Sequence, residues 1–246
     1  MRSNIGILGS GRLGISLAEY YHQYGNNILI TSRQVNKKVI VNRNLLSTVD
    51  NSDAMKNSKI LHLCVKPNNF NELAEQIKPY IEQDQIFISW LAKTKVKDIS
   101  KTLEIDDKRV CRAMGNIFIR NKHGPVCLYK GRSNLNWDFN FPEVNKIWIK
   151  DENIMDTCTI SAGCNPAYLA QIIDIFVKAG VESGLSITES TLIINENLKG
   201  LSDWLNKGLS TSSIKELVSS PNGVTERGLQ HLVGSDLEKI IKDLYT

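Results

Sequence analysis

The sequence predicts an α/β fold for its first half, with a parallel sheet covered by helices on both faces, and an all-α fold for its second half. Three observations predict this division. Short runs that are apolar throughout alternate with amphipathic runs as far as about residue 150, which is typical of parallel strands buried on both faces. A glycine-rich turn joins the first apolar run to the first amphipathic run. After residue 152 long helical segments replace the alternation, so we expect two domains, 1–152 and 153–246.

The first domain is expected to alternate strands and helices in chain order. The strands "NIGILG" and "NILITS" flank an amphipathic helix, residues 12–25, which ends at Gly25, a typical C-terminal stop. The strand "KILHLCV" is followed by a helix around "NFNELAEQIKPYI", and the strand "QIFISWL" by the helix "KVKDISKTL". "KRVCRAM" is a short fifth strand. Residues 121–150 are less regular, with "GPVCLYK" and "NKIWIK" as two further strands.

The second domain is expected to be helical and to associate with a second copy of the chain. The segment "NPAYLAQIIDIFVKAGVESGL" is apolar around most of its circumference, with Gln171, Asp174 and Lys178 as its clearly polar side chains. Helices of this kind are buried on several sides. Fewer than 100 residues remain to cover it, so a homodimer, or a higher oligomer of dimers, is the economical interpretation.

Composition narrows the class of protein. The chain has 246 residues, of which 41% are hydrophobic and 23% charged, as in globular proteins. The net charge of 30 − 26 = +4 is too weak to predict nucleic-acid binding. No uninterrupted apolar run approaches the roughly 18 residues of a membrane span, and the N-terminus does not read as a signal peptide, so we expect a cytoplasmic protein. Five cysteines without a CxxC pair and four scattered histidines predict neither a disulfide framework nor a metal site.

The turn "GILGSGRLG" has the G-x-G-x-x-G spacing, with Gly9, Gly11 and Gly14 between the first strand and the first helix. The first glycine permits the tight turn, the second lets backbone approach a pyrophosphate, and the third lets helix and strand pack closely. The phosphates then lie at the helix N-terminus. This context predicts a Rossmann-like dinucleotide-binding domain, rather than a glycine turn that serves packing alone.

The segment after the second strand favours NADPH, with NADH as the alternative. NAD-binding sites usually carry an acidic residue about 20 residues after the glycines, but no Asp or Glu occurs from Tyr20 to Val49. Arg33, Lys37, Lys38 and Arg43 fall in that window instead. Together with the hydroxyls of Thr31 and Ser32 they could bind a 2′-phosphate. A solvated basic surface is the simpler alternative.

Motifs along the whole chain resemble those of the pyrroline-5-carboxylate reductases, NAD(P)H enzymes of the last step of proline synthesis. The most specific are "DTCTISAGCNPAY", "KAGVESGL" and "LVSSPNGVTERGL"; "NSDAMKNS", "CVKP" and "CRAMGN" match in order and at compatible spacing. The resemblance implies hydride transfer from the reduced nicotinamide to the C=N carbon of a cyclic imino acid. It also implies a set of cofactor-binding residues: Gly9, Ser10, Gly11, Arg12, Leu13 and Gly14 at the pyrophosphate, Ser32 and Arg33 at the 2′-phosphate, Asn51 at the ribose, and Val65, Lys66 and Pro67 at the nicotinamide.

The resemblance places the substrate at the Ser-Ser-Pro turn. Ser220 and the amides of Val224 and Thr225 would bind the carboxylate, Thr225 would also orient the ring nitrogen as the catalytic residue, and Asn116 would lie close to the nicotinamide and substrate. The turn makes chemical sense by itself, because a Pro/Gly turn leaves the first amides of the next helix unpaired. The alternative is a plain helix connector in which Thr225 is an ordinary N-cap.

Several positions depart from the pattern of the family. Gly115 and Ile117 stand where its members usually have proline and threonine, Cys164 and Asn165 replace a Ser-Gly pair, and Asn222 replaces a glycine. The middle helix of the second domain reads Glu196, Asn197 where the family usually has Gln-Thr. Cys164 is interpreted as a packing residue, since imine reduction needs no thiol. Three functions therefore stay open: reduction of 1-pyrroline-5-carboxylate to L-proline, reduction of another cyclic imine, and a non-catalytic dinucleotide-binding regulator.

Overall fold

The computed structural model describes the whole chain except residues 1–3, 34–37, 42–43, 48, 138–140 and 246. It consists of two compact units, residues 1–165 and 166–246. Residues 153–165 pack with the first unit. The sequence instead predicts that residues 153–165 belong to the second domain, with a functional boundary between residues 152 and 153. That functional boundary is still a prediction.

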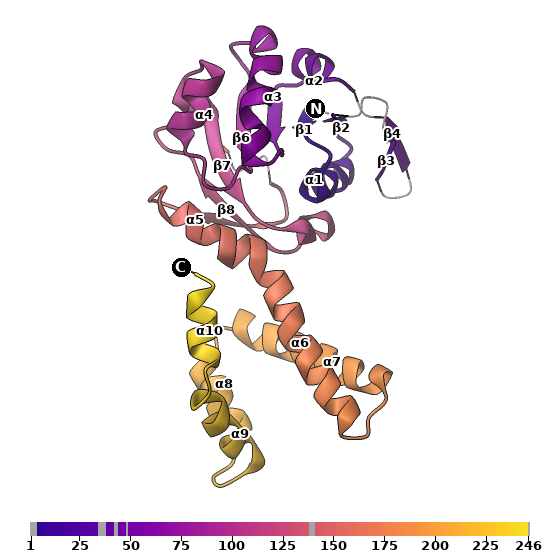
Figure 1. Ribbon diagram of the computed structural model, residues 1–246, viewed down its shortest axis with the longest axis vertical. Coiled ribbons are helices and arrows are strands. Elements are labelled where there is room, and N and C mark those ends of the chain that lie inside the picture. Colours follow the sequence, from indigo (N-terminus) through magenta and orange to yellow (C-terminus); the bar gives the residue numbers. More distant parts are fainter. Residues whose placement is uncertain (1–3, 34–37, 42–43, 48, 138–140, 246) are drawn as a thin grey trace. The chain divides into compact units, whose positions relative to one another are not determined.

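The first unit is built on a seven-stranded sheet with the order β2-β1-β5-β6-β7-β8-β9 (Figure 1). The strands are β1 (Asn4–Leu8), β2 (Asn27–Thr31), β5 (Ile60–Leu63), β6 (Ile86–Ser89), β7 (Val110–Met114), β8 (Pro125–Tyr129) and β9 (Asn145–Trp148). The first five are parallel, as the apolar runs predict, whereas β8 is antiparallel to β7 and β9 is parallel to β8. Strands β2 and β5 lie on opposite sides of β1, so the strand order reverses at β1. In open sheets of this kind, ligands bind in the crevice at the carboxyl ends of the strands where the order reverses, which here are β1 and β5.

Helices cover both faces of this sheet. They are α1 (Arg12–His22), α2 (Asn51–Asn57), α3 (Phe70–Ile77), α4 (Val96–Leu103) and α5 (Ile154–Cys158), with short 3-10 turns η1 (Pro67–Asn69), η2 (Lys78–Tyr80), η3 (Asp107–Arg109) and η4 (Ile117–Asn121). The sequence patterns did not predict α2, the short 3-10 turns, or an antiparallel hairpin of β3 (Lys38–Val41) and β4 (Asn44–Ser47). The hairpin occupies part of the segment in which 2′-phosphate ligands are expected. Lys37 and Arg43, and the side chain of Lys38, lie outside the described residues.

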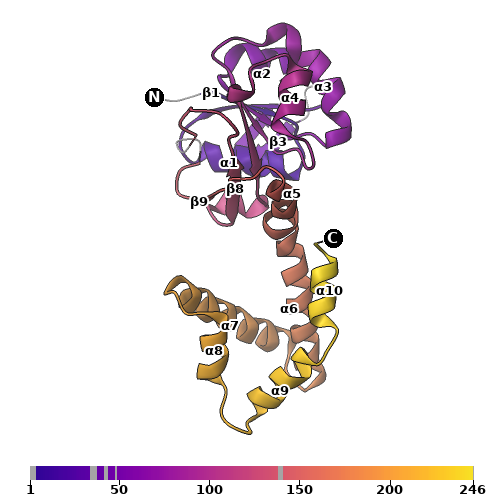
Figure 2. The same cartoon turned by 90° about the vertical axis from the view of Figure 1, so that its left-hand side faces the viewer.

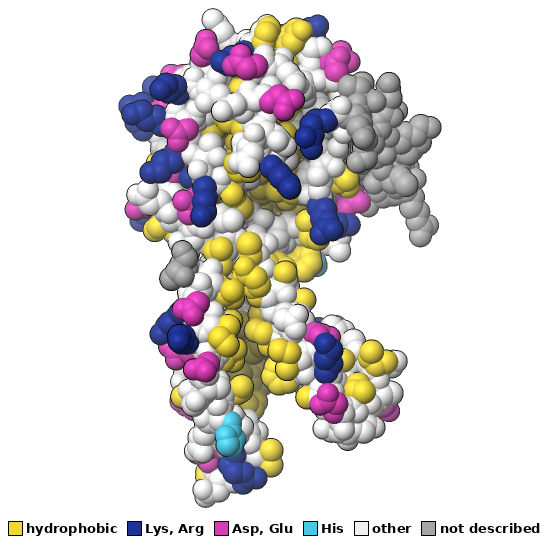
Figure 3. Space-filling model, viewed as in Figure 1, with side chains coloured by type: hydrophobic (Ala, Val, Ile, Leu, Met, Phe, Trp, Pro, Cys, Tyr) yellow, Lys and Arg dark blue, Asp and Glu magenta, His cyan; other side chains and the backbone are white. Residues whose placement is uncertain are grey.

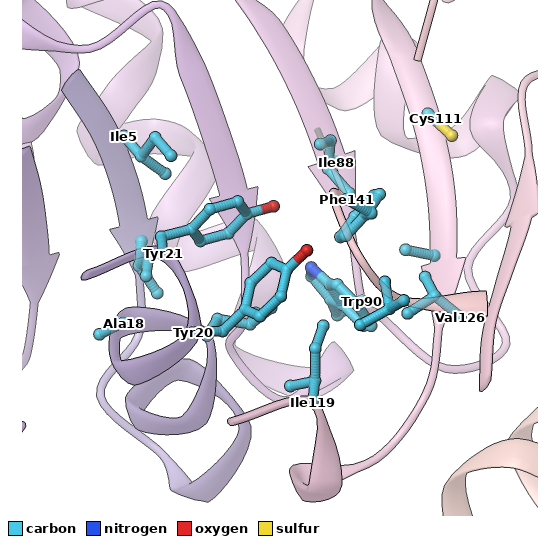
Figure 4. Close-up of a cluster of buried hydrophobic side chains, with 14 of the residues drawn as sticks. Ile5, Ala18, Tyr20, Tyr21, Ile88, Trp90, Cys111, Ile119, Val126 and Phe141 are labelled. Atoms are coloured by element: carbon cyan, nitrogen blue, oxygen red, sulfur yellow. The ribbon is translucent and has the colours of Figure 1, made fainter. Parts of the chain in front are cut away.

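The two faces of the sheet carry separate hydrophobic cores. One core packs α1 against the sheet, where Tyr20 and Tyr21 lie in one cluster with Ile88 of β6 and with Trp90, which follows β6 (Figure 4). The other core packs α2, α3 and α4 against the opposite face (Figure 2). Leu61 of β5 is one of its buried residues. Because every central strand is covered on both sides, the sheet is a rigid support for the loops at its carboxyl edge.

His62 lies in the α1 core as an uncharged residue. Its side chain is fully buried, and its Nδ1 accepts a 3.0 Å hydrogen bond from Nε1 of Trp90. Its Nε2 has no hydrogen-bond partner among the described residues. Burial without a compensating partner for the imidazolium lowers the pKa of His62 from 6.5 to about 3.

This depressed pKa predicts acid sensitivity of the fold. The unfolded chain binds a proton at His62 below pH 6.5 and the folded chain does not, so its contribution is fully present above pH 6.5 and is lost as the pH falls toward 3. Between pH 7.5 and 5 the loss is about 2 kcal/mol. His62→Gln keeps an acceptor for Trp90 and removes the titration. Urea unfolding at the two pH values is expected to show a pH dependence smaller by that amount in the variant; an equal dependence in both proteins would contradict the assignment.

The second unit consists of helices whose apolar side chains are largely exposed. It contains α7 (Ile187–Asn206), α8 (Thr211–Val218), α9 (Val224–Val233), α10 (Leu237–Asp243) and nearly all of α6 (Asn165–Glu182). On α6 no side chain is buried, although Leu169, Ile175 and Phe176 are apolar and more than half exposed. Hydrophobic side chains gather on these helices in Figure 3. A single chain leaves this surface open, as expected for a helical unit that is covered by a partner.

One continuous helix, residues 154–182, combines α5, a π-helical turn and α6. By length and composition alone it could cross a membrane. No uninterrupted apolar run marks this helix in the sequence, because Asp156, Asp174 and Lys178 interrupt the run. Asp174 and Lys178 form an ion pair of 2.6 Å on the surface of the helix. An exposed apolar helix of this kind is also what an oligomer interface requires.

Candidate active site

The glycine turn after β1 is shaped by contacts that exclude side chains. Gly9 has φ +121°, and a Cβ there would lie 2.8 Å from the carbonyl oxygen of Cys64, which follows β5. A Cβ on Gly14 would lie 2.0 Å from the carbonyl oxygen of Gly9. A Cβ on Gly11, in contrast, would meet nothing within 4 Å. The turn is therefore closed on its inner side and open at Gly11, where a ligand can approach the backbone.

The N-terminus of α1 points its unpaired amides into this open space. Gly11 is the N-cap residue, no side chain caps the helix, and its first turn carries no acidic residue. Leu13 is half-buried, as is Ser10 in the turn, while Arg12 is exposed. A helix start of this kind stabilises an anion, so the predicted residues 9–14 form a site that fits a pyrophosphate.

The loop after β5 lies directly against the glycine turn, as the sheet order dictates. Val65 is half-buried, Lys66 is exposed, and Pro67 begins η1 at the same carboxyl edge. The contact of Gly9 with the peptide of Cys64 and Val65 brings the two segments together. The residues predicted at the pyrophosphate and at the nicotinamide are thus neighbours across β1 and β5.

The ribose end of the predicted site includes an acidic residue, Asp50, which lies just beyond the window from Tyr20 to Val49 that contains no acidic residue. Val49 forms a parallel bridge with Thr31, so the chain after Val49 runs beside Ser32, which is half-buried, and the exposed Arg33. The next residue, Asp50, caps α2 by accepting the amide of Asp53 at 2.9 Å, and this hydrogen bond lowers the pKa of Asp50. The carboxylate is therefore engaged in holding α2 in place.

Asn51, predicted to approach the ribose, begins α2. Its Nδ2 donates to Oε1 of Gln76 on α3 at 2.7 Å. Since Asn51 is half-buried at this edge, its Oδ1 is the polar atom that could accept a ribose hydroxyl. The role stays a prediction.

Asn116, predicted to lie near the nicotinamide and substrate, follows β7 and caps η4. Its Oδ1 accepts the amide of Phe118 at 2.9 Å, and its Nδ2 donates to the carbonyl of Ala162 at 2.7 Å. Both ends of the side-chain amide thus bind backbone within the first unit. The preceding Gly115 is buried, and a Cβ there would lie 2.8 Å from the carbonyl oxygen of Pro125.

Ser220, Val224 and Thr225 lie together in the second unit at the start of α9. Gly223 is the N-cap residue and no side chain caps the helix, so Thr225 is the second helical residue and not an N-cap. A Cβ on Gly223 would lie 2.3 Å from Oγ of Ser220, which shows how closely this hydroxyl approaches the helix start. Within the described part of the chain, neither the Ser220 nor the Thr225 hydroxyl makes a hydrogen bond. The turn therefore offers free hydroxyls and free amides to an anion.

Charged side chains flank this turn. The carboxylate of Glu226 accepts the amide of Asn222 at 2.6 Å, and Nη1 of Arg227 donates to the carbonyl of Asn222 at 2.8 Å. Asn222 itself has φ +59°, a conformation that Asn tolerates better than most residues, so asparagine is compatible with this turn. Glu226 places a negative charge beside the predicted carboxylate site, and Arg227 offsets it.

Sequence reasoning missed Arg112, a buried cation on the same strand that leads to Asn116. It lies on β7 and is 1% exposed, with Nη1 3.4 Å from Oε1 of Glu152 and Nη2 3.3 Å from Oδ1 of Asp156. The same Glu152 oxygen accepts the first amide of α4, on Val96, at 2.6 Å. This network ties β7, α4 and α5 together, and the sequence signal for it is a charged residue inside an otherwise apolar strand.

Two cavities occur elsewhere among the described residues. One of about 600 Å³ lies between α6 and α7, and one of about 370 Å³ lies beside β8 and β9. The predicted site residues line neither cavity. Those of the first unit lie at an open sheet edge, and those of the second lie at an exposed turn.

Comparison with known proteins supports the family resemblance seen in the motifs. Residues 152–246 match the family described as pyrroline-5-carboxylate reductase dimerisation. This match supports the predicted membership of the pyrroline-5-carboxylate reductase family. Residues 4–93 match the family described as NADP oxidoreductase, coenzyme F420-dependent, in agreement with a Rossmann-like domain that binds a nicotinamide dinucleotide.

Individual relatives agree with this assignment. The pyrroline-5-carboxylate reductase of Staphylococcus haemolyticus is 27% identical over 203 residues, 79% of this chain and 73% of that protein. That of Pisum sativum is 23% identical over 239 residues, 93% of this chain and 87% of that protein. A crystal structure of Plasmodium falciparum pyrroline carboxylate reductase with NADP bound has the same fold, with a TM-score of 0.87 at 22% identity over 99% of this chain and 94% of that chain.

The two matches agree with the two-unit architecture. They support an oxidoreductase with a Rossmann-like unit, followed by helices that are similar to the dimerisation domain of pyrroline-5-carboxylate reductases.

Proposed function

We propose that the protein reduces the C=N bond of 1-pyrroline-5-carboxylate to give L-proline, with NADPH as the hydride donor. The observation that supports this most directly is the pair of anion sites. One is the open helix start at Gly11, and the other is the uncapped start of α9 beside Ser220. A dinucleotide has a pyrophosphate and a cyclic imino acid has a carboxylate, so the two sites fit the two reactants of such a reductase.

The residues of the chain act mainly by binding and orienting the reactants. Gly9 to Gly14 would hold the pyrophosphate, and the loop of Val65, Lys66 and Pro67 would hold the nicotinamide, which supplies a hydride when bound. Ser220 and the amides of Val224 and Thr225 would bind the carboxylate. A protonated imine is already electrophilic, so positioning provides most of the rate.

Arg33 and Ser32 at the end of β2 support NADPH over NADH, because they can donate to a 2′-phosphate. Asp50 does not oppose this assignment, since its carboxylate is occupied as the cap of α2. The exposed apolar helices support a homodimer or an oligomer of dimers. A small-molecule reductase without nucleic-acid or membrane partners fits a cytoplasmic location.

Reduction of another cyclic imine is the second candidate. It is favoured by Gly115 and Ile117, which replace the family's usual proline and threonine after β7, and Ile117 is 37% exposed at that edge. An exposed hydrocarbon in place of a hydroxyl suits a substrate with a larger or less polar ring.

A panel of substrates tests both candidates. The purified protein is mixed with NADPH or NADH and with 1-pyrroline-5-carboxylate, its six-membered homologue, or an uncharged pyrroline, and loss of reduced-cofactor absorbance is followed. We expect the highest kcat/KM with 1-pyrroline-5-carboxylate and NADPH. A preference for the six-membered ring would favour the second candidate, and binding of NADPH without turnover of any imine would indicate a regulator.

The hydroxyl of Thr225 is expected to contribute to turnover. Thr225→Ala should lower kcat/KM for the imine about tenfold or more, because a hydrogen bond to the ring nitrogen is lost, whereas NADPH affinity should stay within about twofold. Thr225→Ser keeps the hydroxyl and is the matched control. Full activity of the alanine variant would exclude the assigned role.

A further inference from the structure

A π-helical turn interrupts the long helix next to the predicted nicotinamide end. The turn, η6 (Thr159–Cys164), lies between α5 and α6 and belongs to the first unit. Such turns are uncommon and need a local cause, because their hydrogen bonds are spaced one residue wider than those of an α-helix.

Pro166 is the local cause. In an α-helix the carbonyl of Ala162 would accept the amide of residue 166, but a proline at that position has no N–H and its ring collides with this carbonyl. Widening the turn relieves the collision. Residue 166 therefore cannot donate to the Ala162 carbonyl, and Ala162 is 2% exposed, where a donor from a side chain stabilises the carbonyl.

Asn116 supplies a donor to that carbonyl. Its Nδ2 lies 2.7 Å from the Ala162 oxygen, while its Oδ1 is held by the amide of Phe118 at 2.9 Å, which fixes the orientation of the side-chain amide. Gly124, with φ +84°, packs beside Asn116: a Cβ there would lie 3.0 Å from Oδ1. The amide of Phe118 therefore orients the Asn116 side chain through Oδ1, and Nδ2 is directed at the Ala162 carbonyl.

The π-helical turn approaches the end of β7 closely at the same place. A Cβ on Gly163 would lie 3.6 Å from the carbonyl oxygen of Gly115 and 3.7 Å from Sδ of Met114. The hydrogen bond of Asn116 is thus part of a contact that fixes the loop after β7 against the helix.

We propose that Asn116 is a positioning residue that replaces the hydrogen-bond donor removed by Pro166, and so holds the loop Gly115–Asn116 in register with η6. The consequence for catalysis rests on the proposed function, in which this loop lies near the nicotinamide. The role differs from the substrate-binding one that the family resemblance implies, because Asn116 acts through backbone atoms of Ala162 and not through contact with the imine.

A double-mutant cycle with Pro166→Ala tests the proposal in the full-length protein. Asn116→Ala should raise the unfolding equilibrium constant about tenfold at fixed protein concentration, because the Ala162 carbonyl loses its donor. In the Pro166→Ala background residue 166 regains an N–H that can donate to Ala162, so the same substitution should change the constant less than about twofold. An equal effect in both backgrounds would overturn the proposal.

Hydrogen exchange gives a second, local measurement. Amides 159–165 should exchange faster in Asn116→Ala than in the wild type, and this loss of protection should be restored by Pro166→Ala. Asn116→Asp keeps the acceptor for Phe118 but loses the donor, so it should behave like the alanine variant and serves if that variant does not fold. Unchanged protection in both Asn116 variants would contradict the proposed contact.

Steady-state kinetics separate positioning from direct binding. A positioning role predicts a lower kcat for Asn116→Ala with KM for the imine within about twofold, and partial recovery of kcat in the double variant. A raised KM that Pro166→Ala does not restore would identify Asn116 as a substrate ligand. If no imine is reduced at all, the proposed function fails, and the unfolding and exchange measurements still decide the role of Asn116.

Discussion

Gly11→Ala is expected to weaken NADPH binding at least tenfold while leaving the free energy of unfolding within about 0.5 kcal/mol of the wild type. A Cβ at this position meets no atom of the described residues within 4 Å, and the φ of −73° at Gly11 suits alanine. The new methyl group therefore costs nothing in the free protein. It projects into the space at the start of α1 where the pyrophosphate must approach the backbone, so the whole effect should appear in the dissociation constant.

Gly14→Ala is the matched contrast, since the same methyl group here lies 2.0 Å from the carbonyl oxygen of Gly9. The helix must move away from the turn, and we expect a loss of about 3 kcal/mol of stability together with cofactor binding. Urea unfolding and a fluorescence titration with NADPH, run on both variants, separate the two effects. Unimpaired binding by Gly11→Ala would show that the cofactor does not lie on this turn.

Short-range patterns predicted most of the first unit correctly. All seven strands of the main sheet and the glycine turn were found, because each is a contiguous run with its own apolar or glycine signature. The hairpin of β3 and β4 was missed because its segment carries basic residues and resembles a basic linker. The antiparallel direction of β8 also carries no local signal, as it depends on how the chain returns after η4.

The candidate site could be predicted only where its residues are close together in sequence. Gly9 to Gly14 and Ser220 to Thr225 are such cases. The bond of Asn116 to Ala162 joins residues 46 apart, and that of Arg112 to Glu152 joins residues 40 apart, so neither can be read from spacing. Pro166 is an instructive intermediate case. A proline after the start of a helical segment indicates an orphaned carbonyl four residues earlier, but not the side chain that pairs with it.

Gly115→Pro restores the residue usual in the family, yet we expect it to destabilise this protein by about 2 kcal/mol and to give no gain in activity toward 1-pyrroline-5-carboxylate. A Cβ at residue 115 would lie 2.8 Å from the carbonyl oxygen of Pro125 and 3.5 Å from Cζ3 of Trp90. Trp90 packs in the α1 core, and the carbonyl of Pro125 belongs to the first residue of β8. Neither can move without disturbing the sheet.

Ile117→Thr is the control for this prediction, because it reverts a second departure at a side chain that is 37% exposed and should leave stability within about 0.5 kcal/mol. The comparison separates Gly115, where packing determines the residue, from Ile117, where the substrate can determine it. If the apolar side chain of Ile117 determines which imine is preferred, Ile117→Thr alone should raise kcat/KM for 1-pyrroline-5-carboxylate relative to the other imines. A Gly115→Pro protein that is both stable and more active would show instead that the strand end can adapt, and that Gly115 was the determinant of specificity.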